Sequence, residues 1–132
     1  MARARIQAPA TYAITLRCLY RKLLLTPFAP TLHAWILYFL AEAVRRTGAI
    51  LHHITIEPNH IHYVITVTDA NLPTLKRLFH GEVGSFVKKA LERHGFEAPE
   101  LVFGSGRTEQ KQLVNGAAIL TWLHYSDIKA VK

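Results

Sequence analysis

The sequence predicts a single α+β domain in which helices cover one face of an antiparallel β-sheet. The first reason is the order of the periodic segments along the 132 residues, which is strand, helix, two strands, helix and strand, followed by a final helix. The second is that the strand segments alternate apolar and polar residues, as in a sheet with one packed face. The third is that each long helical segment carries a single apolar stripe. This order is the ferredoxin-like split βαβ plan, and we expect residues 1–132 to form it as one domain.

The first predicted strand and helix occupy the N-terminal third of the chain. Residues 12–20 alternate, with apolar side chains on one face and Arg17 on the other. After a proline-containing loop, Thr31 is expected to cap a helix that runs to about Thr47. The apolar residues of this helix recur at spacings of three and four, and Gly48 is expected to end it.

Two further strands are predicted on either side of a Pro-Asn turn, at residues 49–57 and 60–68. The odd-numbered residues of the second of these strands are apolar. Its even-numbered residues include His60 and His62, so the histidines belong to the face turned away from the core.

The elements predicted after residue 68 follow less regular sequence patterns. Asn71 is expected to precede a helix over residues 72–94, and residues 100–103 are expected to form a short fourth strand. A glycine-rich basic loop follows at 104–107, and a last helix is predicted over 115–132. The chain ends inside this helix, so we expect either a truncated chain or a helix that rests on a partner.

Charge and cysteine content narrow the function and the compartment. Lys and Arg outnumber Asp and Glu by 16 to 9, which favours an anionic partner and nucleic acid first, although charge alone fits a merely basic protein equally well. The single cysteine, Cys18, excludes an internal disulfide and indicates a reducing cytoplasm. The apolar segment 32–44 is too short for a transmembrane helix, so no membrane contact is expected.

The most informative residues are His60 and His62. Residues i and i+2 of a strand point the same way and lie roughly 7 Å apart, so two neutral imidazoles can bind one divalent metal ion. The alternative is a pair of polar side chains on a solvated sheet face. His33, His80 and His94 fall on expected helix surfaces and are weaker candidates.

Four segments carry a resemblance to a known family. They are YAITLR at residues 12–17, RKLLL at 21–25, EPNHIH at 57–62 and WLHYSDIKA at 122–130. Together they resemble the HUH single-strand tyrosine transposases, in particular the REP-associated tyrosine transposases. The histidine segment is the most specific of the four, and the resemblance spans nearly the whole chain.

The resemblance implies a ferredoxin-like fold and a divalent metal ion, Mg²⁺ or Mn²⁺, held by His60, His62 and a polar residue of the final helix. In the family, a tyrosine of that helix attacks a phosphate of single-stranded or hairpin DNA, forms a 5′-phosphotyrosine link and releases a 3′-hydroxyl. Tyr125 is the expected nucleophile here, because it is the only tyrosine of the predicted final helix. Asp127 is the expected third ligand, with His124 and Glu57 as further candidates.

The chain departs from the family pattern in the final helix. The family places a tyrosine four residues before an Asn, Gln or His ligand, so that both share one helical face. The best alignment puts Trp122 at the tyrosine position and Ser126 at the ligand position. This departure leaves open a catalytically inactive DNA-binding relative, and a small metal-binding or regulatory module is a third hypothesis.

If the protein binds DNA, its lysines and arginines are the expected phosphate contacts. The alternative for those on helices is an ordinary solvated position. Exposed helix faces also permit a homodimer. The candidate phosphate contacts are Arg17, Arg21, Lys22, Lys76, Arg77, Lys88, Lys89, Arg93 and Arg107.

Overall fold

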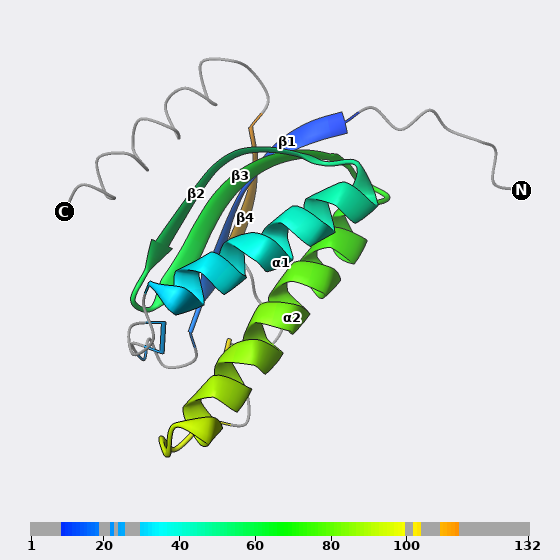
Figure 1. The fold of residues 1–132 in the computed structure, drawn as a ribbon. Helices are drawn as coiled ribbons and strands as arrows, with labels where there is room; N and C mark the ends of the chain where they lie inside the picture. Colours follow the sequence, from blue (N-terminus) through cyan, green and yellow to red (C-terminus); the bar gives the residue numbers. More distant parts are fainter. Residues whose placement is uncertain are drawn as a thin grey trace, which may run out of the picture.

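The computed structural model describes residues 9–18, 22, 24–25, 30–99, 102–103 and 109–113. Its strands and helices are β1 (Pro9–Arg17), α1 (Thr31–Thr47), β2 (Ile50–Glu57), β3 (His60–Thr68), α2 (Leu72–Arg93) and β4 (Glu109–Leu113). The four strands form one antiparallel sheet in the order β2-β3-β1-β4 (Figure 1). The predicted α+β class and βαββαβ order are confirmed, and the final helix predicted over 115–132 lies outside the described residues.

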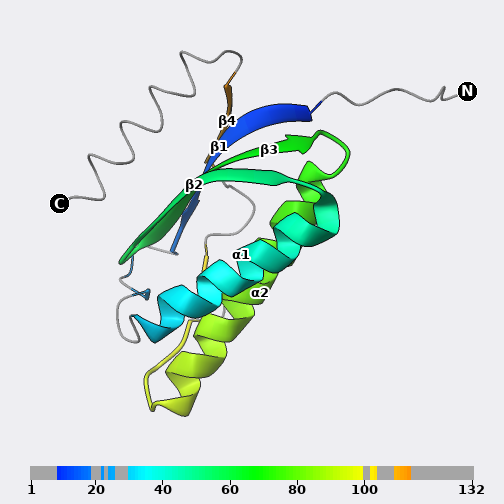
Figure 2. The ribbon, with the colours of Figure 1, turned by 45° about the horizontal axis from the view of Figure 1, so that its top comes forward.

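The hydrophobic core lies between the sheet and the two helices. In both views α1 and α2 lie side by side across the same face of the sheet (Figures 1 and 2). Each fully buried aliphatic or aromatic side chain contributes on the order of 1.5–3 kcal/mol relative to exposure. The fully buried side chains that face this layer include Ile14, Ile61, Tyr63 and Ile65 from the strands and Leu32, Ile36, Leu40, Leu75, Phe79 and Val83 from the helices.

The ends of the helices differ from the predicted caps. Helix α1 begins at Thr31 with Pro30 in the cap position, so Thr31 is not the N-cap. Asn71 precedes α2 as predicted, but its side-chain amide donates to the Thr47 carbonyl 3.0 Å away instead of capping its own helix. This bond joins the start of α2 to the end of α1. The prediction for Gly48 is confirmed, because it ends α1 with a φ of 71°, a conformation that only glycine adopts readily.

The fourth strand is not where the sequence predicted it. At residues 102–103 the chain makes only an isolated antiparallel bridge, between Phe103 and Cys18, and β4 lies at Glu109–Leu113. Four of the five residues of β4 are exposed, so the strand carries no apolar alternation. Edge strands are often polar in this way, and β4 forms because β1 offers an edge for pairing.

Two further expectations concern the burial of Cys18 and the absence of a membrane-spanning helix among the described residues. Cys18 is buried as predicted, and burial raises the pKa of its thiol to about 11, which disfavours the reactive thiolate. Neither described helix combines the length and the apolar character that crossing a bilayer requires.

His80 is not the solvated helix residue that its sequence position suggested. Its Nε2 atom lies 2.8 Å from the Tyr63 hydroxyl, beneath the sheet, and the two rings meet edge to face. Burial, and then the nearby charge of Lys76, lower the pKa of His80 to about 4. His80 is therefore neutral in the folded protein at physiological pH.

This lowered pKa makes the stability depend on pH. Because the unfolded chain protonates His80 near the ordinary pKa of 6.5 and the folded chain only near 4, protons bind the unfolded state preferentially between these values. We expect the free energy of unfolding to fall by roughly 2–3 kcal/mol between about pH 7 and about pH 4.5. Urea denaturation of the wild type and of His80→Gln checks this. The wild type should lose stability over this range and the variant should lose clearly less; parallel pH profiles would contradict the assignment.

Candidate metal centre

His60 and His62 lie on the face of the sheet turned away from α1 and α2. In the pairing of β1 with β3, Arg17 lies opposite His60 and Thr15 lies opposite His62. Directly opposed residues of an antiparallel pair share a face. Both histidines are only 8% exposed, so the alternative of a solvated pair of polar side chains does not describe them.

His60 is held by residues on both sides of the β2–β3 turn. Its Nδ1 atom lies 2.9 Å from the Asn59 side-chain oxygen, and its Nε2 atom lies 2.8 Å from Oε2 of Glu57, which is its cross-strand partner. The two-residue turn brings the carboxylate and the imidazole together at the end of the hairpin.

The 2.8 Å between these two atoms is the length of a direct hydrogen bond between the imidazole and the carboxylate. It places Glu57, which was only a further candidate in the sequence, beside His60. Its carboxylate would be available as an oxygen donor if a metal ion bound at the histidine pair.

His62 is oriented through its other ring nitrogen. Its Nδ1 atom lies 3.0 Å from the Thr15 hydroxyl of the neighbouring strand. Metal-binding histidines are commonly oriented by such a hydrogen bond on the nitrogen that does not bind the metal. If a metal ion bound at this pair, Nε2 of His62 would be the ring nitrogen placed to bind it. No sequence signal identified Thr15 for this role, because it depends on the register between β1 and β3.

The described residues do not form a complete metal site. Among them, no group of three or more His, Cys, Asp or Glu side chains is arranged to hold a metal ion. Asp127 and Tyr125, the expected third ligand and nucleophile, lie outside the described residues. A complete site therefore requires a donor from elsewhere in the chain, or a rotation of Glu57 toward His62.

Two more histidines reach the same face from β2. Strict alternation would place His52 and His53 on opposite faces, but the pairing of β2 with β3 shifts register between Leu51 and His53. His52 Nε2 lies 2.6 Å from the Thr66 hydroxyl, and His53 Nε2 lies 2.9 Å from the Thr55 hydroxyl. Each of these two rings is therefore hydrogen-bonded to a threonine hydroxyl.

The structure separates the candidate phosphate contacts into two groups. Arg17 lies beside His60 on the polar face, where it forms a bidentate pair with Glu109 at 3.3 and 3.4 Å. Lys76, Arg77, Lys88 and Lys89 all belong to α2, on the other side of the sheet, and Lys76 also donates to Gln110 of β4 at 2.9 Å. Lys22 is exposed. Arg21 and Arg107 lie outside the described residues.

The fold of this chain is similar to that of proteins of known structure. No protein-family model and no curated protein sequence matches the chain. Among solved structures, it is similar to a candidate transposase from Deinococcus radiodurans R1, with a TM-score of 0.63 and 14% identity over 95% of each chain. It is also similar to a REP-associated tyrosine transposase bound to a REP hairpin, with a TM-score of 0.62 and 15% identity over 99% of this chain and 73% of that one.

The chain shares the fold of these transposases. The resemblance drawn from the four sequence segments is therefore confirmed at the level of the fold. At 14–15% identity the likeness extends no further than the fold, so activity has to be argued from the site itself.

Proposed function

We propose that the protein is a metal-dependent single-stranded DNA endonuclease and strand transferase of the HUH transposase type. The observation that carries the proposal is the buried pair His60 and His62, with Glu57 beside it, on a fold that two transposases share. One of those transposases is bound to a hairpin. The net charge of +7 suits a DNA partner.

The donor chemistry of this site fits a divalent metal ion. His60 and His62 would bind it through their ring nitrogens, and Asp127 or Glu57 would supply an oxygen. Imidazole donors favour Mn²⁺ over Mg²⁺, which prefers oxygen ligands and bound water. When bound, the metal supplies a Lewis acid that polarises the scissile phosphate.

The protein's own residues would carry out the transfer. The phenol oxygen of Tyr125 forms a bond to phosphorus while the bond from phosphorus to the 3′-oxygen breaks, and the phenol proton ends on the released 3′-hydroxyl. The phosphotyrosine ester conserves the energy of the broken bond, so rejoining needs no ATP. Arg17, beside His60, is the cation best placed to stabilise charge on the phosphate.

A DNA-binding protein without cleavage activity is the second candidate. Trp122 and Ser126 at the family's tyrosine and ligand positions are the observations that favour it. Such a protein would bind hairpin DNA in a salt-sensitive way and form no covalent adduct.

A covalent-capture experiment separates the two. The wild type is incubated with Mn²⁺ and fluorescent hairpin DNA carrying single-stranded flanks, and the products are run on a denaturing gel. We expect a covalent protein–DNA band that is lost in Tyr125→Phe, because phenylalanine has no hydroxyl with which to attack. Tyr38→Phe, which alters an exposed tyrosine of α1, is the matched control and should keep the band. Binding without any band in the wild type would favour the second candidate.

A further inference from the structure

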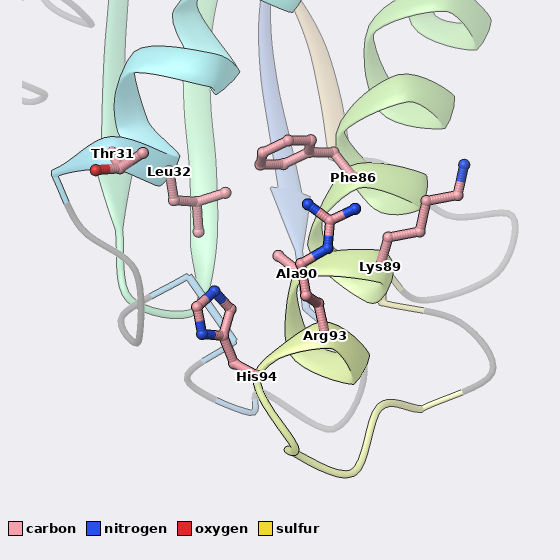
Figure 3. Close-up of a pocket in the computed structure, with 7 residues that line it drawn as sticks. All are labelled: Thr31, Leu32, Phe86, Lys89, Ala90, Arg93 and His94. Atoms are coloured by element: carbon pink, nitrogen blue, oxygen red, sulfur yellow. The ribbon is translucent and has the colours of Figure 1, made fainter.

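A cavity of about 480 Å³ lies between the start of α1 and the end of α2, on the helical side of the molecule (Figure 3). Helix α1 contributes Thr31 and Leu32, α2 contributes Phe86, Lys89, Ala90 and Arg93, and His94 lies at the C-cap of α2. The histidine pair takes no part in it, because His60 and His62 lie on the opposite face of the sheet.

The lining divides into an apolar wall and a cationic rim. Phe86, Leu32 and Ala90 form the wall. In Figure 3 the Arg93 guanidinium extends toward the Phe86 ring and the His94 ring turns toward Leu32, while the Lys89 side chain extends outward, away from the Arg93 guanidinium. The cavity can therefore hold a flat apolar group and an anion at the same time.

The described lining of the cavity includes the cations Lys89 and Arg93 and no acidic residue. Within the described part of the chain, neither Lys89 nor Arg93 forms an ion pair with a carboxylate. The first turn of α1 has no acidic residue and no side-chain cap, so its backbone N–H groups add positive potential here, against the negative potential of the carbonyl end of α2. An anionic group in the cavity would therefore find its charged partner in Arg93.

The aromatic wall is held rigidly by its neighbours. The Phe86 ring packs at 5.4 Å from Trp35 and at 5.6 Å from Phe39, measured between ring centroids. A ring fixed in this way offers a ready surface for a planar base, because little side-chain freedom is lost when the base stacks on it. A bare phosphate would leave most of the cavity volume and the whole apolar wall unused.

We infer that this cavity binds one nucleotide, with its base against Phe86 and its phosphate at Arg93. Nucleotides combine a flat aromatic base with an anion, which is the combination that the wall and the rim match. A nucleotide within a DNA strand and a free mononucleotide present the same base and phosphate, so either could occupy the cavity.

The position of the cavity favours a DNA strand. Two residues before α1 are bonded to the β2–β3 turn, since Cys18 N–H donates to the Asn59 carbonyl at 2.8 Å and Leu25 N–H to the Pro58 carbonyl at 3.0 Å. Figures 1 and 2 show the start of α1 close to this turn. A strand whose scissile phosphate lies at His60 would reach the cavity by passing around the end of the hairpin. The choice of a DNA strand over a free mononucleotide rests on the proposed function.

Fluorescence anisotropy with labelled single-stranded DNA tests the inference. Arg93→Gln is expected to weaken binding by about fivefold to tenfold at low salt and to lower the slope of log affinity against log salt by roughly 1, since one phosphate contact is lost. Phe86→Leu keeps an apolar side chain but removes the stacking surface. It should weaken binding to single strands by several-fold and leave the affinity for blunt duplex DNA unchanged.

A matched control comes from the other end of α1. Arg46→Gln removes one exposed positive charge at the last turn of α1, away from the cavity lining. It should bind single strands within about twofold of the wild type. Equal losses in Arg93→Gln and Arg46→Gln would overturn the inference, because they would reflect net charge alone.

A second arm separates the two sources of the nucleotide. In saturation-transfer NMR with thymidine monophosphate, the base protons should receive only a weak signal from the wild-type protein, because the free mononucleotide binds weakly. The opposite result would be strong mononucleotide binding that Arg93→Gln abolishes while its affinity for single strands is unchanged. It would rule out a DNA strand as the occupant and assign the cavity to a free nucleotide. The covalent-capture assay remains independent. A band that depends on Tyr125, together with unaltered binding in both cavity variants, would refute the cavity and leave the proposed function intact.

Discussion

Replacing His60 with alanine is expected to lower Mn²⁺-dependent cleavage of hairpin DNA by at least about a hundredfold. The variant loses one of two buried imidazole donors, and Lewis-acid stabilisation of a phosphate is worth several kcal/mol, with each 1.36 kcal/mol equal to about tenfold in rate. The variant also leaves the Glu57 carboxylate without the ring nitrogen that lies 2.8 Å away. Initial cleavage rates across a Mn²⁺ titration would measure the effect.

The control for this experiment lies on the same face of the sheet. His52 reaches that face and contacts the Thr66 hydroxyl, but it does not belong to the His60 and His62 pair. His52→Ala should therefore cleave within about threefold of the wild type. A His60→Ala variant that is folded and retains wild-type cleavage and Mn²⁺ dependence would rule out the histidine pair as the metal centre.

Phe79→Ala is expected to destabilise the fold by about 3–5 kcal/mol. The Phe79 side chain of α2 is completely buried, and its ring meets the Tyr63 ring of β3 edge to face at a centroid distance of 5.3 Å. The substitution removes apolar area and leaves a cavity at the contact between helix and sheet. Since small domains are stable by only about 5–15 kcal/mol, the variant should be close to unfolding at 37 °C.

Urea denaturation at neutral pH measures this loss. Leu37→Ala is the control, since the Leu37 side chain is 46% exposed on α1 and its truncation should change stability by about 0.5 kcal/mol or less. Similar denaturation midpoints for the two variants would mean that Phe79 does not anchor α2 on the sheet.

The expected effects of His60→Ala and Phe79→Ala both follow from the division of the sheet into two faces. The face toward α1 and α2 is filled by side chains such as Phe79 and Tyr63, and the opposite face carries the histidine pair. A shift of β3 by one residue would exchange the two faces and place His60 and His62 against the helices. The same alternation therefore stabilises the fold and positions the candidate metal centre.

The predictions that were correct rest on strong local periodicity. β3 was predicted at 60–68 and lies at His60–Thr68, because its apolar residues alternate without interruption. The same period of two placed both histidines on one face without knowledge of the fold. The predictions that failed concern weak local signals. β4 has one buried residue in five, and its position depends on the free edge of β1 rather than on its own composition.

By itself, the sequence determined the order of the elements, the bounds of β3 and the shared face of His60 and His62, since each follows from spacing along a single segment. Only the tertiary structure decided what surrounds the pair. The contact between His62 and Thr15 joins residues 47 positions apart, and it exists because β1 pairs with β3 in one register. The nucleotide-sized cavity likewise exists because the start of α1 meets the end of α2. Periodicity describes which way a side chain points from its own strand or helix, whereas its neighbours depend on how distant segments pack and pair.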